Sequence, residues 1–407
     1  MRSSSSVGET LVASLHAGPS TTPRLRHLLA EVDWDELRTA AEFHGVENWV
    51  YAAAARASSA PALVAGFEAA RLRQDLLRAQ VVADLSLAAA SLNGASIPWL
   101  AFKGPVLDEV IHRPPRLRSY GDLDLLVSVR SLGQALEVLE QTGAVVLDKN
   151  WAHLSQDHSG QLHVRLTHGT LADLHWHFVN QGSDQSRFRI DIDDVLARRR
   201  MVRIGELDIP TLDAVDTVVH VAIHAAHHGG DRLLWLKDIE QCVLNETPPW
   251  DAIAARCDEW GVGVAVATLL ARTRRVLGLA LPDQVLHSLG YRPPWSTLTR
   301  TLDRLAPTES ALGDRSLARM TAGVASGDQK QSFVTFTRRS AWILAHWSSA
   351  RTRPRDPEDQ SYPLQATGGS DGRAQYLAAI ERAGTEAGVA NAAMHKDVRR
   401  SSRRSGG

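Results

Sequence analysis

The chain has 407 residues, with 45 lysines and arginines against 46 aspartates and glutamates, so its formal net charge is −1. This length allows two or three domains, and an apolar fraction of 44% is ordinary for a soluble globular protein. A balance so close to neutral argues against nucleic acid as a partner, because no overall field attracts a polyanion.

The sequence also lacks features of export and of membrane insertion. The residues after Met1 are arginine and serines rather than the apolar core of a signal peptide. No apolar run approaches the length of about 18 residues that a membrane span needs, so no membrane partner is expected. The two cysteines, Cys242 and Cys257, have no metal-like spacing and favour a reducing compartment. We therefore expect a cytoplasmic protein.

The first part of the chain changes from a polar segment to a helical one. Residues 1–22 are rich in serine, threonine and glycine and are expected to be disordered. Residues 23–94 carry apolar residues at helical spacing, which predicts an N-terminal helical subdomain that packs on a sheet. Asp33 is typical of an N-cap, and a long amphipathic helix is expected to end at Asn93-Gly94.

Residues 95–205 are expected to form the core that carries the chemistry. An apolar strand ends in Lys103-Gly104, and Arg118 follows in a basic, proline-broken loop. The stretch 121–127 then reads Gly-Asp-Leu-Asp-Leu-Leu-Val. At the two-residue period of a strand, Asp122 and Asp124 point to one face while the intervening leucines point to the other. Two carboxylates there are costly without a cation, and Mg²⁺ is the obvious partner.

A second alternating strand supplies a third carboxylate. After a helix near residues 131–142 and a short strand near 144–147, strands are expected over 161–167 and 171–177. Asp173 and His175 lie on one face of the last strand. Three converging carboxylates are what two-metal phosphoryl chemistry requires.

These elements together resemble the DNA polymerase β type of nucleotidyltransferase, and in particular a branch known as uncharacterised nucleotidyltransferases. The matching residues are Lys103-Gly104, Arg118, the 121–127 motif and Asp173-Leu-His-Trp. The resemblance implies catalytic and metal-binding roles for Asp122, Asp124 and Asp173, with Asp173 as the base. The wider superfamily has a Gly-Ser pair upstream of the two aspartates, which is absent here.

Lys103, Gly104, Arg118 and Gly121 are therefore expected to bind the nucleotide. Positive charge there would neutralise the phosphate oxygens. The resemblance further implies Mg²⁺ or Mn²⁺ as cofactor and a nucleoside triphosphate as donor.

Residues 351–407 are expected to be a disordered tail interrupted by a short helix near 374–383. The region 206–350 is expected to be a C-terminal helical subdomain, whose last helix is expected over about 296–350. Within it, a helix starting near Thr211 gathers histidines, among them His220 and His224, on the side opposite its valines. Histidines at i and i+4 ligate zinc in other proteins, which would suggest a metal-dependent phosphohydrolase. The alternative interpretation is that His220 and His224 contact the acceptor, with His175 orienting the acidic residues.

The prediction is an α+β protein in which a small mixed sheet lies between N-terminal and C-terminal helical blocks. Its predicted activity is transfer of a nucleoside monophosphate from a nucleoside triphosphate to a hydroxyl of an unidentified small molecule or peptide, with release of pyrophosphate. Two other hypotheses are a non-catalytic nucleotide-binding module of the same fold and the phosphohydrolase at His220 and His224.

Overall fold

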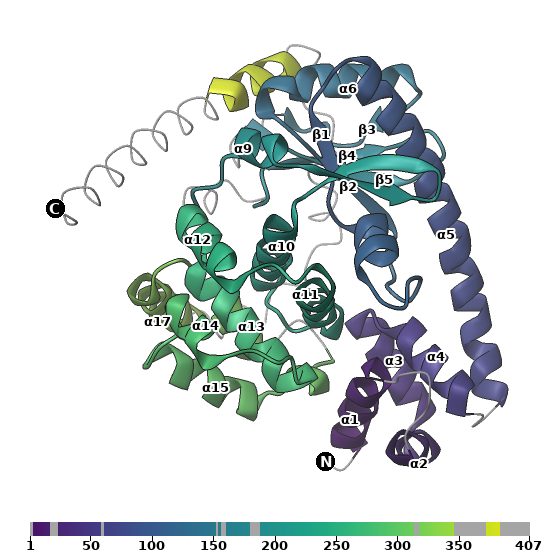
Figure 1. Cartoon of the computed structure of the whole chain (residues 1–407), viewed down its shortest axis with the longest axis vertical. Coiled ribbons are helices and arrows are strands. Elements are labelled where there is room, and N and C mark those ends of the chain that lie inside the picture. The colour runs from purple at the N-terminus through teal and green to yellow at the C-terminus, as the bar shows by residue number, and fades with distance from the viewer. Residues whose placement is uncertain are drawn as a thin grey trace.

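A five-stranded mixed sheet lies at one end of the molecule, and two groups of helices extend from it in the computed structural model (Figure 1). The structure describes residues 3–16, 23–57, 61–151, 154–155, 160–179, 188–312, 317–345 and 372–382.

The strand order places the acidic motif at the centre of the sheet. The sheet runs β1-β2-β5-β4-β3. Its strands are β1 (Trp99–Ala101), β2 (Asp122–Val127), β3 (Val145–Val146), β4 (Gln161–Arg165) and β5 (Leu171–His175). Only the β2–β5 pair is parallel, and β1, β4 and β3 pair antiparallel with their neighbours. A separate hairpin consists of β6 (Arg200–Ile204) and β7 (Leu207–Thr211).

Helices make up most of the remaining described chain. Before the sheet come α1 (Ser3–Leu15), α2 (Pro23–Glu31), α3 (Trp34–His44), α4 (Glu47–Ala57) and α5 (Pro61–Gly94). Within the sheet region lie η1 (Val106–Ile111), η2 (Val129–Ser131), α6 (Leu132–Gln141) and α9 (Ile192–Ala197). After it come α10 (Ala214–His227), α11 (Leu233–Glu246), α12 (Trp250–Trp260), α13 (Gly263–Leu277), α14 (Asp283–Ser288), α15 (Trp295–Leu305), η3 (Thr308–Ser310), α16 (Leu317–Ala322) and α17 (Gln329–Ala345).

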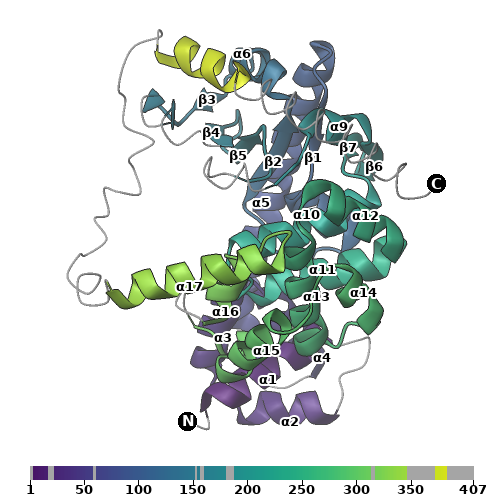
Figure 2. The ribbon, with the colours of Figure 1, turned by 90° about the vertical axis from the view of Figure 1, so that its left-hand side faces the viewer.

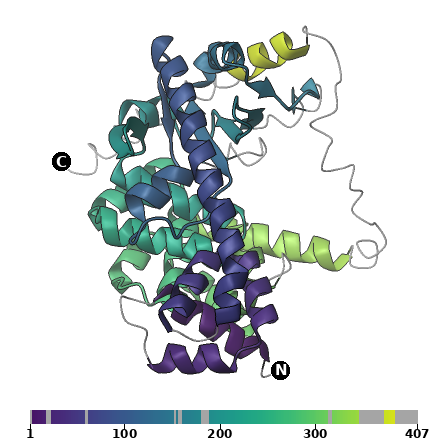
Figure 3. The ribbon, with the colours of Figure 1, turned by 90° about the vertical axis from the view of Figure 1, so that its right-hand side faces the viewer.

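Two hydrophobic cores follow from the alternation of strand residues. Leu123, Leu125 and Val127 of β2 pack with α5 and α6 in one core. Leu126, on the opposite face, belongs to the other core, which contains α1–α4 and α10–α13. The polar face of β2 is therefore turned toward the helices that follow the sheet. Figure 3 shows α5 running from the sheet down to the N-terminal helices.

The α+β class is confirmed, and so are most of the predicted elements. The helix near 131–142 is α6, and the strands predicted over 161–167 and 171–177 are β4 and β5. The N-cap at Asp33 is also confirmed, because its side chain accepts hydrogen bonds from the amides of Asp35 and Glu36.

Two expectations about the flanking regions are wrong, those for residues 3–15 and for residues 296–350. Residues 3–15 form α1 rather than a disordered segment, because Leu11 and its neighbours are buried against α2–α4. The N-terminal block was expected to pack on the sheet, and α5 does so from Val81 onward, in one core with β2. The helices α1–α4 share the other core with α10–α13 and with Leu100 and Leu126 of the sheet. The single helix expected over 296–350 is divided among α15, η3, α16 and α17.

The short helix expected in the tail forms over residues 372–382 and lies beside α6, as the yellow segment in Figure 2 shows. Arg373 pairs with Glu140 of α6, and Tyr376 is fully buried near Trp151. The rest of the predicted tail lies outside the described residues. None of the helices that the structure describes combines the length and apolarity needed to cross a membrane.

Candidate active site

The two strands that carry the acidic residues are aligned in register. In the parallel pair, Asp124 of β2 stands directly opposite Asp173 of β5, and Leu126 stands opposite His175. The carboxylate oxygens of Asp124 and Asp173 and a ring nitrogen of His175 lie within 4.8 Å of one another. Among the residues that the structure describes, this is the one group of three such side chains with the spacing to hold a metal ion.

Lys103 brings a positive charge into this group. Its Nζ lies 2.5 Å from Oδ1 of Asp124, and Nε2 of His175 lies 3.0 Å from the same oxygen. Burial alone would raise the pKa of Asp124, but the Lys103 ammonium and then His175 lower it. Asp124, which is 2% exposed, therefore stays ionised within the protein.

Gly104 allows the chain to turn tightly against the start of β2. Its φ is +46°, and a Cβ at this position would lie 3.0 Å from the carbonyl oxygen of Asp122. A side chain here would thus be strained both by the left-handed backbone and by contact with β2. The glycine lets the segment that carries Lys103 approach the two aspartates closely.

Asp122 occupies the exposed first position of β2, on the same face as Asp124. It is not part of the group with metal-holding spacing, where His175 stands instead. Although Asp122 is exposed as a residue, the surrounding protein partly excludes water from its carboxylate, and this desolvation and then the charge of Asp124 raise its pKa. Burial and the charge of Asp124 likewise raise the pKa of Asp173. The three carboxylates thus interact electrostatically, and bringing them together costs free energy that a cation would recover.

Two residues of β4 that the sequence analysis did not identify contact Asp173. Gln161 donates a hydrogen bond of 3.0 Å to Oδ2 of Asp173, and Nε2 of His163 lies 3.8 Å from Oδ1. His163 is held by the buried Asp148, which accepts hydrogen bonds from its backbone N and its Nδ1. This pairing raises the pKa of His163. The alternation of residues 161–165 predicted the strand, but nothing in the sequence indicated which carboxylate it would face.

Arg118 is buried in an ion pair with Asp238 of α11. Its Nε and Nη2 donate hydrogen bonds of 2.8 and 3.0 Å to the two carboxylate oxygens of Asp238, which also lies 2.8 Å from Nε2 of His112. Its remaining Nη1 is 3.4 Å from the carbonyl oxygen of Ser119. Burial would lower the pKa of Arg118, but the charge of Asp238 raises it. The guanidinium is therefore engaged within the protein, whereas the nucleotide-binding role predicted for it remains a prediction.

Gly121 differs from Gly104, because a Cβ at Gly121 would meet no atom within 4 Å. Sterics therefore do not demand glycine there. The position immediately before Asp122 is open.

Helix α10 brings its histidines toward Lys103. His220 is 2% exposed, contacts the rings of Phe102 and Phe178, and has no hydrogen-bond partner for either ring nitrogen among the described residues. Burial and then the charge of Lys103 lower the pKa values of His220 and His224 far below the usual range. Both are therefore neutral. Neither belongs to the group with metal-holding spacing, so the phosphohydrolase hypothesis gains no support from the described residues.

The fold and this acidic site define a nucleotidyltransferase type of protein. A family model described as "uncharacterised nucleotidyltransferase" matches residues 30–278, which is more than half of the chain. The chain belongs to this family. The match extends beyond the residues that carried the resemblance and includes α3–α5 and α10–α13. A search of curated proteins found no match.

Proposed function

We propose that the protein transfers a nucleoside monophosphate from a nucleoside triphosphate to a hydroxyl group of a small molecule or peptide and releases pyrophosphate. The observation that supports this most strongly is the direct alignment of Asp124 with Asp173, with Lys103 bound to Asp124. Family membership supports the general class of reaction.

The donor set fits a hard divalent cation. Mg²⁺ binds through one or two protein carboxylates together with substrate phosphates, and Asp122, Asp124 and Asp173 offer such oxygens on two neighbouring strands. When bound, the ion would neutralise charge on the triphosphate and favour the ionised form of the acceptor hydroxyl.

The other residues have roles that follow from their positions. The acceptor oxygen forms a bond to the α-phosphorus while the bond from that phosphorus to the β-phosphate oxygen breaks. Asp173 receives the hydroxyl proton, and its raised pKa suits a base. Lys103 can contact phosphate oxygens as well as Asp124, and the open space at Gly121 admits the nucleotide.

Arg118 acts in this proposal by holding the loop before β2 against α11. Its ion pair with Asp238 fixes the residues that lead into the acidic motif. His175 orients Asp124 through its Nε2. The unpaired nitrogens of His220, together with the neighbouring His224, would receive polar groups of the acceptor.

The proposal can be tested without knowing the acceptor, because water can replace the acceptor hydroxyl in a slow reaction. The test is to determine which phosphate bond of the nucleoside triphosphate is cleaved. Each nucleoside triphosphate, with and without Mg²⁺, is incubated with the full chain, and the products are separated. Mg²⁺-dependent formation of monophosphate and pyrophosphate is expected. Asp173→Asn should reduce the rate by about 100-fold or more, the usual effect of losing a general base.

Asp208→Asn provides the matched control, because this carboxylate of β7 is 66% exposed and should leave the rate unchanged. Release of inorganic phosphate with a nucleoside diphosphate would contradict the proposal and would favour a phosphohydrolase. An unchanged rate in Asp173→Asn would contradict the role of this residue.

A further inference from the structure

A concave site is lined by residues of helices α13, α14 and α15 and of the loop between the last two. These helices lie away from the sheet (Figures 1 and 2). The site has a volume of about 500 Å³, which is within the range of roughly 300–1,000 Å³ usual for small-molecule sites. Most of its lining residues lie after residue 278, where the family match ends. None of them belongs to the candidate active site.

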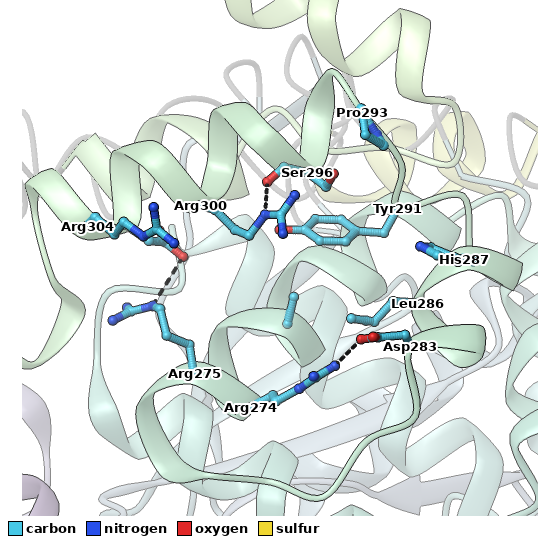
Figure 4. Close-up of a pocket in the computed structure, with 12 residues that line it drawn as sticks. Arg274, Arg275, Asp283, Leu286, His287, Tyr291, Pro293, Ser296, Arg300 and Arg304 are labelled. Atoms are coloured by element: carbon cyan, nitrogen blue, oxygen red, sulfur yellow. Dashed lines mark hydrogen bonds and ion pairs between the residues drawn. The ribbon is translucent and has the colours of Figure 1, made fainter.

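Positive charge dominates this pocket. Arg274, Arg275, Arg300 and Arg304 line it, as Figure 4 shows, together with the carboxylates of Asp283 and Asp303. Asp303 is already engaged by the buried Arg272 beneath the pocket, through hydrogen bonds of 2.8 and 3.2 Å. Asp283 pairs with Arg274. The carboxylates therefore balance only part of the charge.

Two of the arginines lack an acidic partner. Arg300 donates from Nε to the carbonyl oxygen of Ser296, at 2.9 Å, and neither it nor Arg304 forms an ion pair with a described residue. They stand at i and i+4 on α15, so they lie on the same side of the helix. Two neighbouring guanidinium groups with free N–H donors are suited to binding phosphate, because each planar guanidinium can donate two parallel hydrogen bonds to two phosphate oxygens.

The floor of the pocket is apolar. Leu286 and Tyr291 are buried there, and the hydroxyl of Tyr291 is directed to Thr299 rather than left unpaired. A purely inorganic ion would not use this surface. An organic body would cover it and gain hydrophobic free energy.

We propose that this pocket binds a small organic phosphate carrying at least two negative charges. The phosphates contact Arg300 and Arg304, and the organic part lies on Leu286 and Tyr291. The site is independent of the candidate active site.

Calorimetric titration of the full chain with ADP tests this proposal. The protein carries Lys103→Met and the buffer contains no divalent cation, so that binding of phosphate groups at the candidate active site is weakened. ADP is expected to bind, and to bind more tightly than inorganic pyrophosphate. Adding Arg300→Ala/Arg304→Ala should lower the affinity for ADP by about ten-fold or more. The substitutions Arg300→Lys/Arg304→Lys, which keep the charge, should lower this affinity less.

The control is Lys330→Ala/Arg338→Ala, which removes two exposed positive charges from α17, outside the pocket. Its affinity for ADP should match that of the parent protein. Because Arg300 and Arg304 are exposed, their loss should leave the circular dichroism spectrum unchanged. Absence of ADP binding, equal weakening by the α17 pair, or no effect of the α15 pair would overturn the proposal. Pyrophosphate binding as tightly as ADP would overturn the role of the apolar floor.

Discussion

Asp238→Ala is expected to destabilise the protein because it leaves the buried Arg118 without its partner. Asp238 is 3% exposed and accepts two hydrogen bonds from Arg118. Hydrogen bonds to charged groups contribute about 1.5–3 kcal/mol each. The sum for two such hydrogen bonds is similar to the cost of about 3–5 kcal/mol that is usual when one partner of a buried ion pair is removed. The free energy of unfolding should fall by this amount.

Urea unfolding followed by tryptophan fluorescence measures the effect. Asp208→Ala is the matched control, because it removes a carboxylate from the exposed pair with Arg203 and should cost at most about 1 kcal/mol. The double substitution Arg118→Met/Asp238→Leu should cost less than Asp238→Ala, because no buried charge is left alone. The reasoning is refuted if Asp238→Ala unfolds like the wild type but loses affinity for nucleoside triphosphates, since Arg118 would then act on the nucleotide.

Three further predictions concern the approach to the acidic motif and the β4–β5 turn. Lys103→Met should weaken binding of a nucleoside triphosphate about ten-fold or more in a titration, because the phosphates lose a cation; unchanged affinity would argue against this contact. Gly104→Ala should lower the free energy of unfolding by about 1–2 kcal/mol in urea, since φ is +46° there; a neutral effect would contradict the strain. Burial alone would raise the pKa of Asp84, but hydrogen bonds from His168 and Thr170 lower it. Its contribution to stability is therefore complete above the ordinary carboxyl pKa of about 4 and is lost as pH falls below it. In Asp84→Asn, the midpoint of thermal unfolding, measured at about half-unit steps between about pH 5 and 3, should depend less on pH than in the wild type. An unaltered pH dependence of the midpoint would contradict this.

The strand that carries Asp122 and Asp124 was predictable because its pattern is local. Alternation of carboxylates and leucines determined both the element and the face of each residue, and β2 buries Leu123, Leu125 and Val127 as expected. The same reasoning predicted β5 with Asp173. The alignment of Asp124 with Asp173 in one parallel pair required the structure, because register between distant strands depends on the packing of both faces.

The partners of the site residues were less predictable. Arg118 and Asp238 are separated by 120 residues, and nothing local to either shows that they pair. Likewise, His220 lies near Lys103 because α10 brings its ring against Phe102, the residue before Lys103. The helix α1 was missed for a related reason. Its serine-rich start favours disorder by composition, whereas burial of Leu11 among α2–α4 stabilises the helix through tertiary contacts.

Nucleotide binding tests the central claim most directly, with the wild type compared to Asp122→Ala/Asp124→Ala. The midpoint of thermal unfolding is measured with each nucleoside triphosphate, in the presence and absence of Mg²⁺. A ligand that binds the folded state stabilises it by RT ln(1 + [L]/Kd), so even modest affinity shifts the midpoint. The account predicts a shift that requires Mg²⁺ and disappears in the double variant. No Mg²⁺-dependent shift with any nucleoside triphosphate, or an equal one in the double variant, would contradict it.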